Sequence, residues 1–284
     1  MNIPIRFLLL FCVLICKSCL LSAVNGHDLN IVILGDSNTS IGGDDCTNPK
    51  GWSKWFADKI SPKTCKSYAR SGATWTNTVR TRYDIVENTQ VLSDNNVIFN
   101  QMNRLITACD NQQQPSPDLI LIAAGTNDAW FNSKRPGIFS KTVEQAFGTP
   151  NTFNAPQKVS SVVSLAGSVK LICEKLMSRF PDAQIVLLSP MQTTKASYDI
   201  INKVGNILEE CAHRMSIPII RQDYITGVYS SRETNGYFLT VDGTHTSERG
   251  ARRNGYLIAN QITSLLCYYF TCFSFHEIFL NIII

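Results

Sequence analysis

Four short runs of aliphatic residues constrain the fold of this chain more than any other feature. They lie at Leu29–Leu34, Leu119–Ala123, Gln184–Leu188 and Ile217–Ile220. Each run is too short for a helix and lacks a clear alternation of polar and apolar residues, so we expect a β-strand buried on both faces. Lys66–Ala69 predicts a further strand, with a weaker pattern.

Longer amphipathic segments separate these runs and are predicted to be helices. They are Trp52–Ile60, Val97–Cys109, Val159–Phe180, Ala196–Met215 and Arg249–Leu266. Strands that alternate with helices are typical of a parallel sheet with helices on both faces. The sequence therefore predicts an α/β fold, a three-layer α/β/α sandwich with a central, mostly parallel five-stranded sheet.

Residues 1–26 have the pattern of a secretory signal peptide. Arg6 precedes the apolar run Phe7–Ile15, and small and polar residues follow through Gly26. This order of a positive start, a short apolar stretch and a small-residue exit is typical of exported proteins. The apolar run is also short for a membrane span, which needs roughly 20 apolar residues. We therefore expect a secreted or periplasmic protein.

We expect one domain over residues 27–266 and an apolar tail of unassigned role at 267–284. The tail approaches the length of a membrane span, but its embedded polar residues argue against one. It can pack as a final strand or helix, or contact a membrane or a partner. Loss of Arg6 and Lys17 with the signal peptide lowers the formal net charge from +4 to +2. That charge gives no basic footprint for nucleic acid.

The cysteines fit an oxidising compartment, in which disulfides persist. Seven of the ten remain after residue 26, and an odd count leaves at least one unpaired or paired between chains. They are Cys46, Cys65, Cys109, Cys173, Cys211, Cys267 and Cys272. Cys46 and Cys65 lie in loop-like sequence and form a candidate disulfide. No Cys-x-x-Cys spacing remains after residue 26, so we expect no structural zinc site.

Polar residues follow the predicted strands, at the edge where an open α/β sheet binds ligands. Gly35-Asp36-Ser37-Asn38 follows the first strand, and Ser71-Gly72-Ala73 follows the weaker second one. Gly125-Thr126-Asn127-Asp128 follows the third. Asp242-Gly243-Thr244-His245 stands just before the last predicted helix. These four blocks are the candidate functional residues.

Ser37 and His245 have the chemistry of nucleophilic catalysis. A serine hydroxyl is a weak nucleophile until a base takes its proton, and imidazole titrates near neutral pH. Of the four histidines, only His245 sits in a polar turn with an acid, Asp242, three residues before it. That spacing lets the carboxylate fix the tautomer of the ring. The alternative is that Asp242 only holds the turn before the last helix.

The four blocks together resemble the SGNH hydrolases, also called GDSL-like esterases. That family is named for Ser, Gly, Asn and His in four separate blocks, and all four occur here in the expected order. Asn38 stands where the GDSL name has Leu, at a position that varies within the family. The resemblance implies a flavodoxin-like fold and Ser37, Asp242 and His245 as catalytic residues. It implies no metal and no organic cofactor.

The resemblance also implies an oxyanion hole. Its donors would be the backbone N–H groups of Ser37 and Gly72 and the side-chain amide of Asn127, each worth roughly 3–4 kcal/mol of barrier. Glycine suits a backbone donor because no side chain blocks the substrate. The alternatives are an ordinary turn glycine and an ordinary turn asparagine. We expect Asp36 and Asp128 to hold loops through backbone hydrogen bonds.

Two tryptophans closely follow the oxyanion-hole positions. Trp75 or Trp130 could stack on a sugar ring or cover an acyl group, and core packing is the alternative. Residues 129–158 are rich in Asn, Phe, Gly, Pro and Thr. A connection this long is usually functional or mobile, so it is either a rim of the active site or a surface excursion without function.

These observations predict a secreted serine ester hydrolase that removes short acyl groups, acetyl first among them, from a glycan or another small ester. Ser37 would attack, and His245 would activate the water that hydrolyses the acyl-enzyme. A lipase or lysophospholipase is the enzymatic alternative and predicts a preference for long acyl chains. A non-catalytic carbohydrate-binding protein on the same scaffold is the alternative from another class. The sequence does not fix the oligomeric state.

Overall fold

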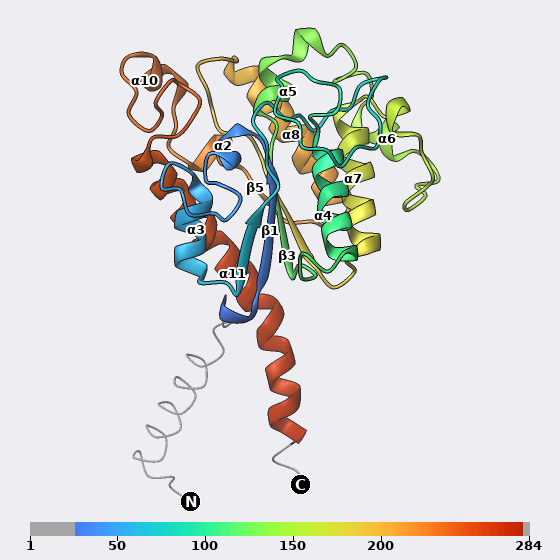
Figure 1. Ribbon diagram of the computed structural model, residues 1–284, viewed down its shortest axis with the longest axis vertical. Coiled ribbons are helices and arrows are strands. Elements are labelled where there is room, and N and C mark those ends of the chain that lie inside the picture. The colour runs from blue at the N-terminus through green and yellow to red at the C-terminus, as the bar shows by residue number, and fades with distance from the viewer. Residues whose placement is uncertain (1–25, 281–284) are drawn as a thin grey trace, which may run out of the picture.

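The computed structural model describes residues 26–280, with the side chains of residue 27 and residues 267–280 outside the description. Its centre is a five-stranded sheet in the order β2-β1-β3-β4-β5, with every pair parallel (Figure 1). The strands are β1 (Asn30–Gly35), β2 (Thr64–Ser67), β3 (Leu119–Ala123), β4 (Gln184–Leu188) and β5 (Ile219–Ile220). This is the strand order of flavodoxin-like folds, so the predicted fold class is confirmed.

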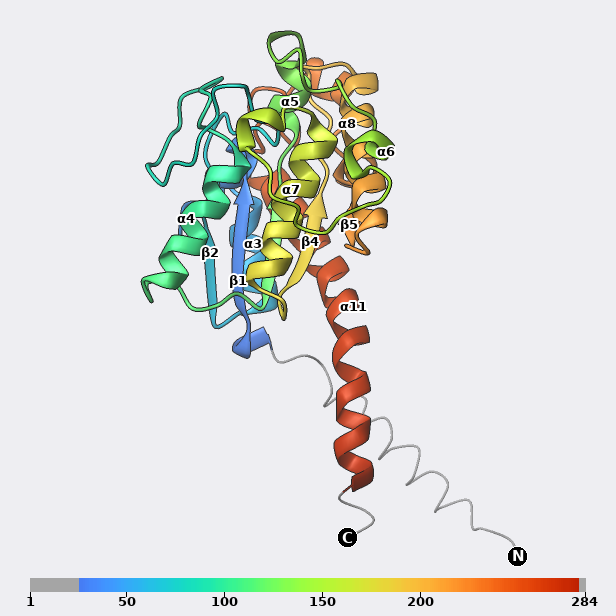
Figure 2. The same cartoon turned by 90° about the vertical axis from the view of Figure 1, so that its right-hand side faces the viewer.

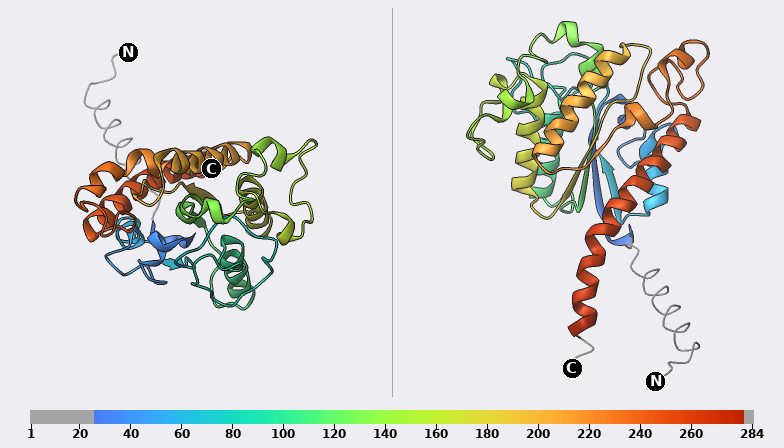
Figure 3. Two further views of the ribbon diagram at one scale, coloured as in Figure 1. Left: turned by 90° about the horizontal axis from the view of Figure 1, so that it is seen from above. Right: turned by 180° about the vertical axis from the view of Figure 1, so that it is seen from behind.

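Helices cover both faces of the sheet (Figures 2 and 3). On one face lie α4 (Ile98–Asp110), α7 (Leu165–Arg179) and α8 (Tyr198–Arg214), and on the other lie α3 (Trp52–Ile60) and α11 (Glu248–Leu280). The connections hold the short helices α2 (Ser37–Ser40), α5 (Thr126–Trp130), α6 (Val143–Phe147), α9 (Gln222–Ile225) and α10 (Ser230–Thr234). Single 3-10 turns occur at η1 (Gly26–Asp28), η2 (Asn132–Lys134) and η3 (Val159–Ser161).

Successive residues of each strand point into two separate cores. In β1, Val32 and Leu34 pack with the helices on one face, whereas Ile31 and Ile33 pack against α3 and α11 on the other. All of these side chains are fully buried. Because both faces of the strand need apolar residues, the sequence shows an unbroken aliphatic run instead of an alternating one.

Helix α11, near the C-terminal end of the chain, packs closely on α3, near its N-terminal end. A Cβ added at Gly255 would overlap the backbone carbonyl of Trp52, so a glycine is needed at this crossing. The segment that precedes α3 therefore lies beside the turn that precedes α11, and Thr246 donates a hydrogen bond to the Lys50 carbonyl.

Two predicted helices differ from the observed ones. The segment Val159–Phe180 breaks into the turn η3 and helix α7, because Ser164 caps α7 by accepting a hydrogen bond from the N–H of Gly167 at 3.2 Å. The last helix continues past Leu266 to Leu280. Within the described residues, no helix is both long enough and apolar enough to span a membrane. The predicted signal peptide lies outside the described residues, except for Gly26.

The long connection at 129–158 is only partly a surface segment. Ile138, Val143 and Phe147 are buried in the core under α7 and α8. Its second and third residues, Trp130 and Phe131, lie close after the third polar block.

Candidate active site

The first polar block forms a tight turn between β1 and α2. Asp36 is the N-cap residue of α2, and its Oδ1 accepts a hydrogen bond from the N–H of Asn38 at 3.1 Å. Ser37 is the first residue of this helix and is 9% exposed. Because the first turn of a helix leaves its N–H groups without intrahelical partners, the backbone N–H of Ser37 is available to a ligand.

Gln101 of α4 fixes the residue before this turn. Its Oε1 accepts a hydrogen bond from the N–H of Gly35, and its Nε2 donates one to the Gly35 carbonyl, both at 2.8 Å. The side chain is almost fully buried. Gln101 was not identified from the sequence. The pattern that could have identified it is a polar residue among the apolar positions of the predicted helix, between Ile98 and Leu105.

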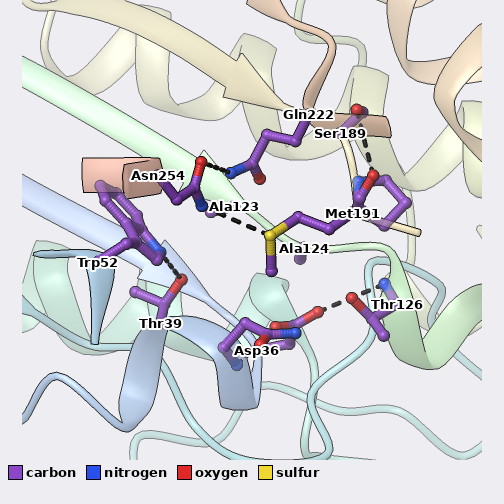
Figure 4. A pocket seen from close by; sticks show the side chains of 12 residues that line it. Asp36, Thr39, Trp52, Ala123, Ala124, Thr126, Ser189, Met191, Gln222 and Asn254 are labelled. Carbon is purple, nitrogen blue, oxygen red and sulfur yellow. Dashed lines mark hydrogen bonds between the residues drawn. The ribbon is translucent and has the colours of Figure 1, made fainter. Parts of the chain in front are cut away.

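Asp36 also ties the first block to the third. Its Oδ2 accepts a hydrogen bond from the N–H of Thr126 at 3.3 Å, and Figure 4 shows the two side by side. Burial raises the pKa of Asp36 to about 6, and the hydrogen bonds from Asn38 and Thr126 offset this only in part. The loop after β1 therefore depends on a carboxyl group that is costly to ionise.

Asp128 ties the third block to the second. Its carboxylate accepts hydrogen bonds from the N–H of Trp75 at 2.9 Å, and from the N–H and Oγ1 of Thr76 at 3.0 and 2.7 Å. Burial raises the pKa of Asp128, and these hydrogen bonds oppose the rise. The expectation that Asp36 and Asp128 hold loops through backbone hydrogen bonds is confirmed.

Two of the predicted donors of the oxyanion hole, the backbone N–H of Gly72 and the side-chain amide of Asn127, lie near each other. Asn127 donates a hydrogen bond from Nδ2 to the carbonyl of Ala73 at 3.0 Å, so its amide lies beside the residue that follows Gly72. One amide hydrogen of Asn127 remains for a ligand. Gly72 has φ +78°, and a Cβ there would lie 3.0 Å from Val91. Both the conformation and the space favour glycine.

Asp242 and His245 form a hydrogen-bonded pair in the turn before α11. Asp242 Oδ2 lies 2.6 Å from Nδ1 of the imidazole. Its Oδ1 accepts hydrogen bonds from the N–H groups of His245 and Thr244 at 2.8 and 2.9 Å. Burial opposes ionisation of Asp242, but these hydrogen bonds outweigh it and hold its pKa below the ordinary value. A carboxylate that accepts a hydrogen bond from Nδ1–H leaves the other ring nitrogen, Nε2, without a proton, so that Nε2 can act as a proton acceptor.

Further contacts hold the histidine turn against its neighbours. Thr246 donates a hydrogen bond from Oγ1 to the carbonyl of Lys50 at 3.0 Å, in the segment between α2 and α3. The N–H of Thr194, after β4, donates to the Gly243 carbonyl at 2.9 Å. Within residues 26–280 no hydrogen bond joins Ser37 to His245. Catalytic hydrogen bonds are often long before substrate binds.

The two tryptophans have different positions. Trp75 is fully buried, and its Nε1 donates a hydrogen bond to the Ala124 carbonyl at 3.2 Å. Of the two alternatives for Trp75, the structure therefore favours core packing over a contact with substrate. Trp130 is half-buried and stacks on Phe131, with ring centroids 5.0 Å apart. It remains a candidate contact for substrate.

A small cavity lies beside the turn that holds Asp36 and Asn38 (Figure 4). Its volume is about 10 Å³, and Asp36, Thr126, Ser189 and Asn254 are among its lining residues. A space of this size is comparable to one water molecule and is too small for an acyl group. In the described part of the chain, no three His, Cys, Asp or Glu side chains gather as metal ligands would.

The sequence of residues 33–253 matches the GDSL-like lipase/acylhydrolase family. The match covers all four polar blocks and most of the chain. The chain belongs to this family. Its members include ester hydrolases, so the family supports a hydrolase with esterase activity. No curated protein matches the sequence.

Solved structures support the fold of this GDSL-like hydrolase. A candidate GDSL-like lipase from Bacteroides ovatus has a TM-score of 0.51 at 16% identity, over 84% of this chain and 99% of that one. A protein from Lactobacillus plantarum has a TM-score of 0.52 at 15% identity, over 86% and 99%. At these identities the likeness shows a shared fold.

Replacing Asp242 by Asn tests the histidine pair. Asparagine would present an N–H or a weaker acceptor to Nδ1 and would no longer select the productive tautomer. We expect kcat on p-nitrophenyl acetate to fall by roughly 10²–10⁴-fold with little change in KM. Glu248→Gln, an exposed acid in the same segment, is the matched control. Equal rates for Asp242→Asn and the control would contradict the assigned role.

Replacing Asp36 by Asn tests whether the buried carboxyl group titrates near pH 6. Between pH 3.8 and about 6, the folded chain keeps a proton here that the unfolded chain releases, so the wild type loses stability as the pH rises. The amide cannot titrate. The free energy of unfolding of Asp36→Asn, relative to wild type, should rise by roughly 2 kcal/mol from about pH 4 to about pH 7.

Urea unfolding of both proteins across this pH range measures the difference. Above the folded pKa the difference should level off. A difference that stays constant across the whole range would show that Asp36 does not titrate in it.

Proposed function

We propose that this GDSL-like hydrolase is a secreted serine esterase that hydrolyses short acyl esters, acetyl esters first among them, on carbohydrate. The observation that carries the proposal is the Asp242–His245 pair, with 2.6 Å between Oδ2 and Nδ1. In the same chain, Ser37 of the first polar block is the first residue of helix α2. An orienting acid, a base and a serine at a strand end are the components of acyl transfer.

The first half of the reaction forms an acyl-enzyme. His245 takes the proton of the Ser37 hydroxyl at Nε2 while Oγ attacks the ester carbonyl, and Asp242 stabilises the resulting imidazolium through Nδ1–H. The carbonyl oxygen becomes an oxyanion, which the N–H groups of Ser37 and Gly72 and the amide of Asn127 bind. As the tetrahedral intermediate collapses, His245 gives its proton to the leaving alcohol.

The second half releases the acid. Water enters where the alcohol left, His245 takes one of its protons, and the hydroxide attacks the acyl carbon of the Ser37 ester. The same donors bind the second oxyanion. Collapse breaks the bond to Ser37 Oγ, and the proton returns from His245 to the serine. Apart from the ester and the water, the groups that act in these steps are side chains and backbone of this chain.

Two features support a carbohydrate ester and an exported enzyme. The half-buried Trp130, stacked on Phe131, offers an aromatic face of the kind that packs on sugar rings. The signal-peptide pattern of residues 1–26 supports export to a compartment where glycan esters occur.

A lipid-ester substrate is the second candidate, and one surface favours it. The loop between β2 and α4 exposes five large apolar side chains, and one of them, Val91, lies directly against Gly72. They are Val79, Tyr83, Ile85, Val86 and Val91. A lipid acyl chain could lie over such residues.

Hydrolysis of p-nitrophenyl acetate by the purified protein, beside Ser37→Ala, tests the proposal. Removing the nucleophile should lower kcat/KM by several orders of magnitude, because the water reaction left behind lacks the covalent route. Ser264→Ala, an exposed serine on α11, is the control and should stay within about twofold. Equal rates for Ser37→Ala and the control would exclude Ser37 as the nucleophile.

The chain length of the acyl group separates the two candidates. A short-chain esterase should lose kcat/KM as the ester is lengthened from acetate to butyrate to octanoate, and should release acetate from an acetylated polysaccharide. A rise of kcat/KM with chain length would instead favour the lipid-ester candidate.

A further inference from the structure

Two cysteines that are distant in sequence face each other at the edge of the sheet. Cys46 lies between α2 and α3, and Cys65 lies in β2. Their Sγ atoms are 3.3 Å apart, although the residues are 19 positions apart in the chain. Cys46 is buried at 2% exposure, and Cys65 is half-buried beside it.

Independent contacts fix the backbone on both sides of this pair. Cys65 pairs in register with Ile31 of the neighbouring strand β1. Cys46 has a left-handed backbone, φ +58°, which is uncommon for a residue other than glycine. Its N–H donates to the Gly43 carbonyl at 3.2 Å, and the N–H of Ser67 donates to the Asp44 carbonyl at 2.8 Å. The close approach of the sulfur atoms therefore follows from the fold on both sides.

The other cysteines with described side chains have different surroundings. Cys211 Sγ lies 3.9 Å from the Ala166 carbonyl, and Cys109 Sγ lies 3.8 Å from the Pro115 carbonyl. Cys173 lies on α7 and is fully buried in the core. Among the described side chains, only Cys46 and Cys65 bring two sulfur atoms into contact. The pairing is specific and not a consequence of many cysteines.

We propose that Cys46 and Cys65 form a disulfide that restrains the segment between α2 and α3. Closure needs the sulfur atoms to approach by only about 1 Å, to the bond length of about 2.05 Å. This inference is independent of the proposed esterase activity.

The oxidant is a second disulfide, either of an exchange protein or of a small thiol such as glutathione. The more accessible sulfur, Cys65, attacks it as the thiolate, forms a mixed disulfide and releases one thiol. The thiolate of Cys46 then attacks Cys65 Sγ and releases the second thiol. Two protons leave the cysteines, and the oxidant gains two protons and two electrons. The hydrogen bond with Cys46, together with burial, raises the pKa of Cys65, so closure is faster at alkaline pH.

The restrained segment contacts three of the four polar blocks. It begins directly after α2. The N–H of its first residue, Ile41, donates a hydrogen bond to the Ser37 carbonyl at 3.1 Å. Asp44 binds Arg70, next to the glycine block, at 2.8 Å. The carbonyl of Lys50 accepts the hydrogen bond from Thr246, beside His245. A cross-link in this segment therefore limits the relative motion of the groups around the site.

Peptide mapping of the full chain tests the disulfide directly. The protein is incubated with oxidised glutathione, its remaining thiols are alkylated under denaturing conditions, and the digest is analysed without reductant. We expect one cross-linked peptide pair that contains Cys46 and Cys65, with Cys109 alkylated. Alkylation of both Cys46 and Cys65, or cross-linking of either to another cysteine, would overturn the proposal.

Thermal unfolding with and without dithiothreitol supplies a second measurement. Loss of a cross-link across a loop of this length should lower the Tm of the wild type by roughly 5–12 °C. Cys109→Ser should show the same loss, whereas Cys46→Ser/Cys65→Ser should have the same Tm in both conditions. A wild-type Tm that does not respond to dithiothreitol after oxidation would contradict the restraint, even if the double variant folds poorly.

Discussion

Two buried carboxylates connect three loops that the sheet alone would leave independent. Asp36, after β1, accepts the N–H of Thr126 after β3, and Asp128, after β3, accepts N–H groups of Trp75 and Thr76 after β2. A parallel sheet brings the carboxyl ends of its strands to one edge but does not set the loops that follow. The chain of hydrogen bonds from the first block to the third and then to the second supplies that order.

These hydrogen bonds fix the positions of the three loops, but burying two carboxyl groups lowers the stability of the fold. Burial raises the pKa of both Asp36 and Asp128, which means that ionising them in the folded chain is unfavourable. The apolar layers on the two faces of the sheet offset that cost. In return, the amide of Asn127 is held beside the Gly72 block through its hydrogen bond to the Ala73 carbonyl. A hole of fixed donors stabilises a developing oxyanion without reorganising at the moment of reaction.

The sequence predicted what depends on local pattern. The bounds of β3, β4 and α3 agree with the observed ones, because aliphatic runs and an amphipathic repeat identify such elements locally. Strand β2 lies two residues earlier than expected, since an edge strand with Lys66 and Ser67 shows little pattern. The clamp of Gln101 on Gly35 and the buried position of Trp75 were not predicted. Both result from contacts between residues far apart in the chain, which a local pattern cannot express.

We propose that Ser37 is an activated nucleophile and that the Asp242–His245 pair removes its proton. A fluorophosphonate probe, which reacts covalently only with activated serines, tests it without assuming any natural substrate. We expect one label per chain, located by peptide mapping at Ser37, and very slow labelling when His245 is replaced by Ala. A label on a different serine, or labelling of Ser37 at the same rate without His245, would contradict it.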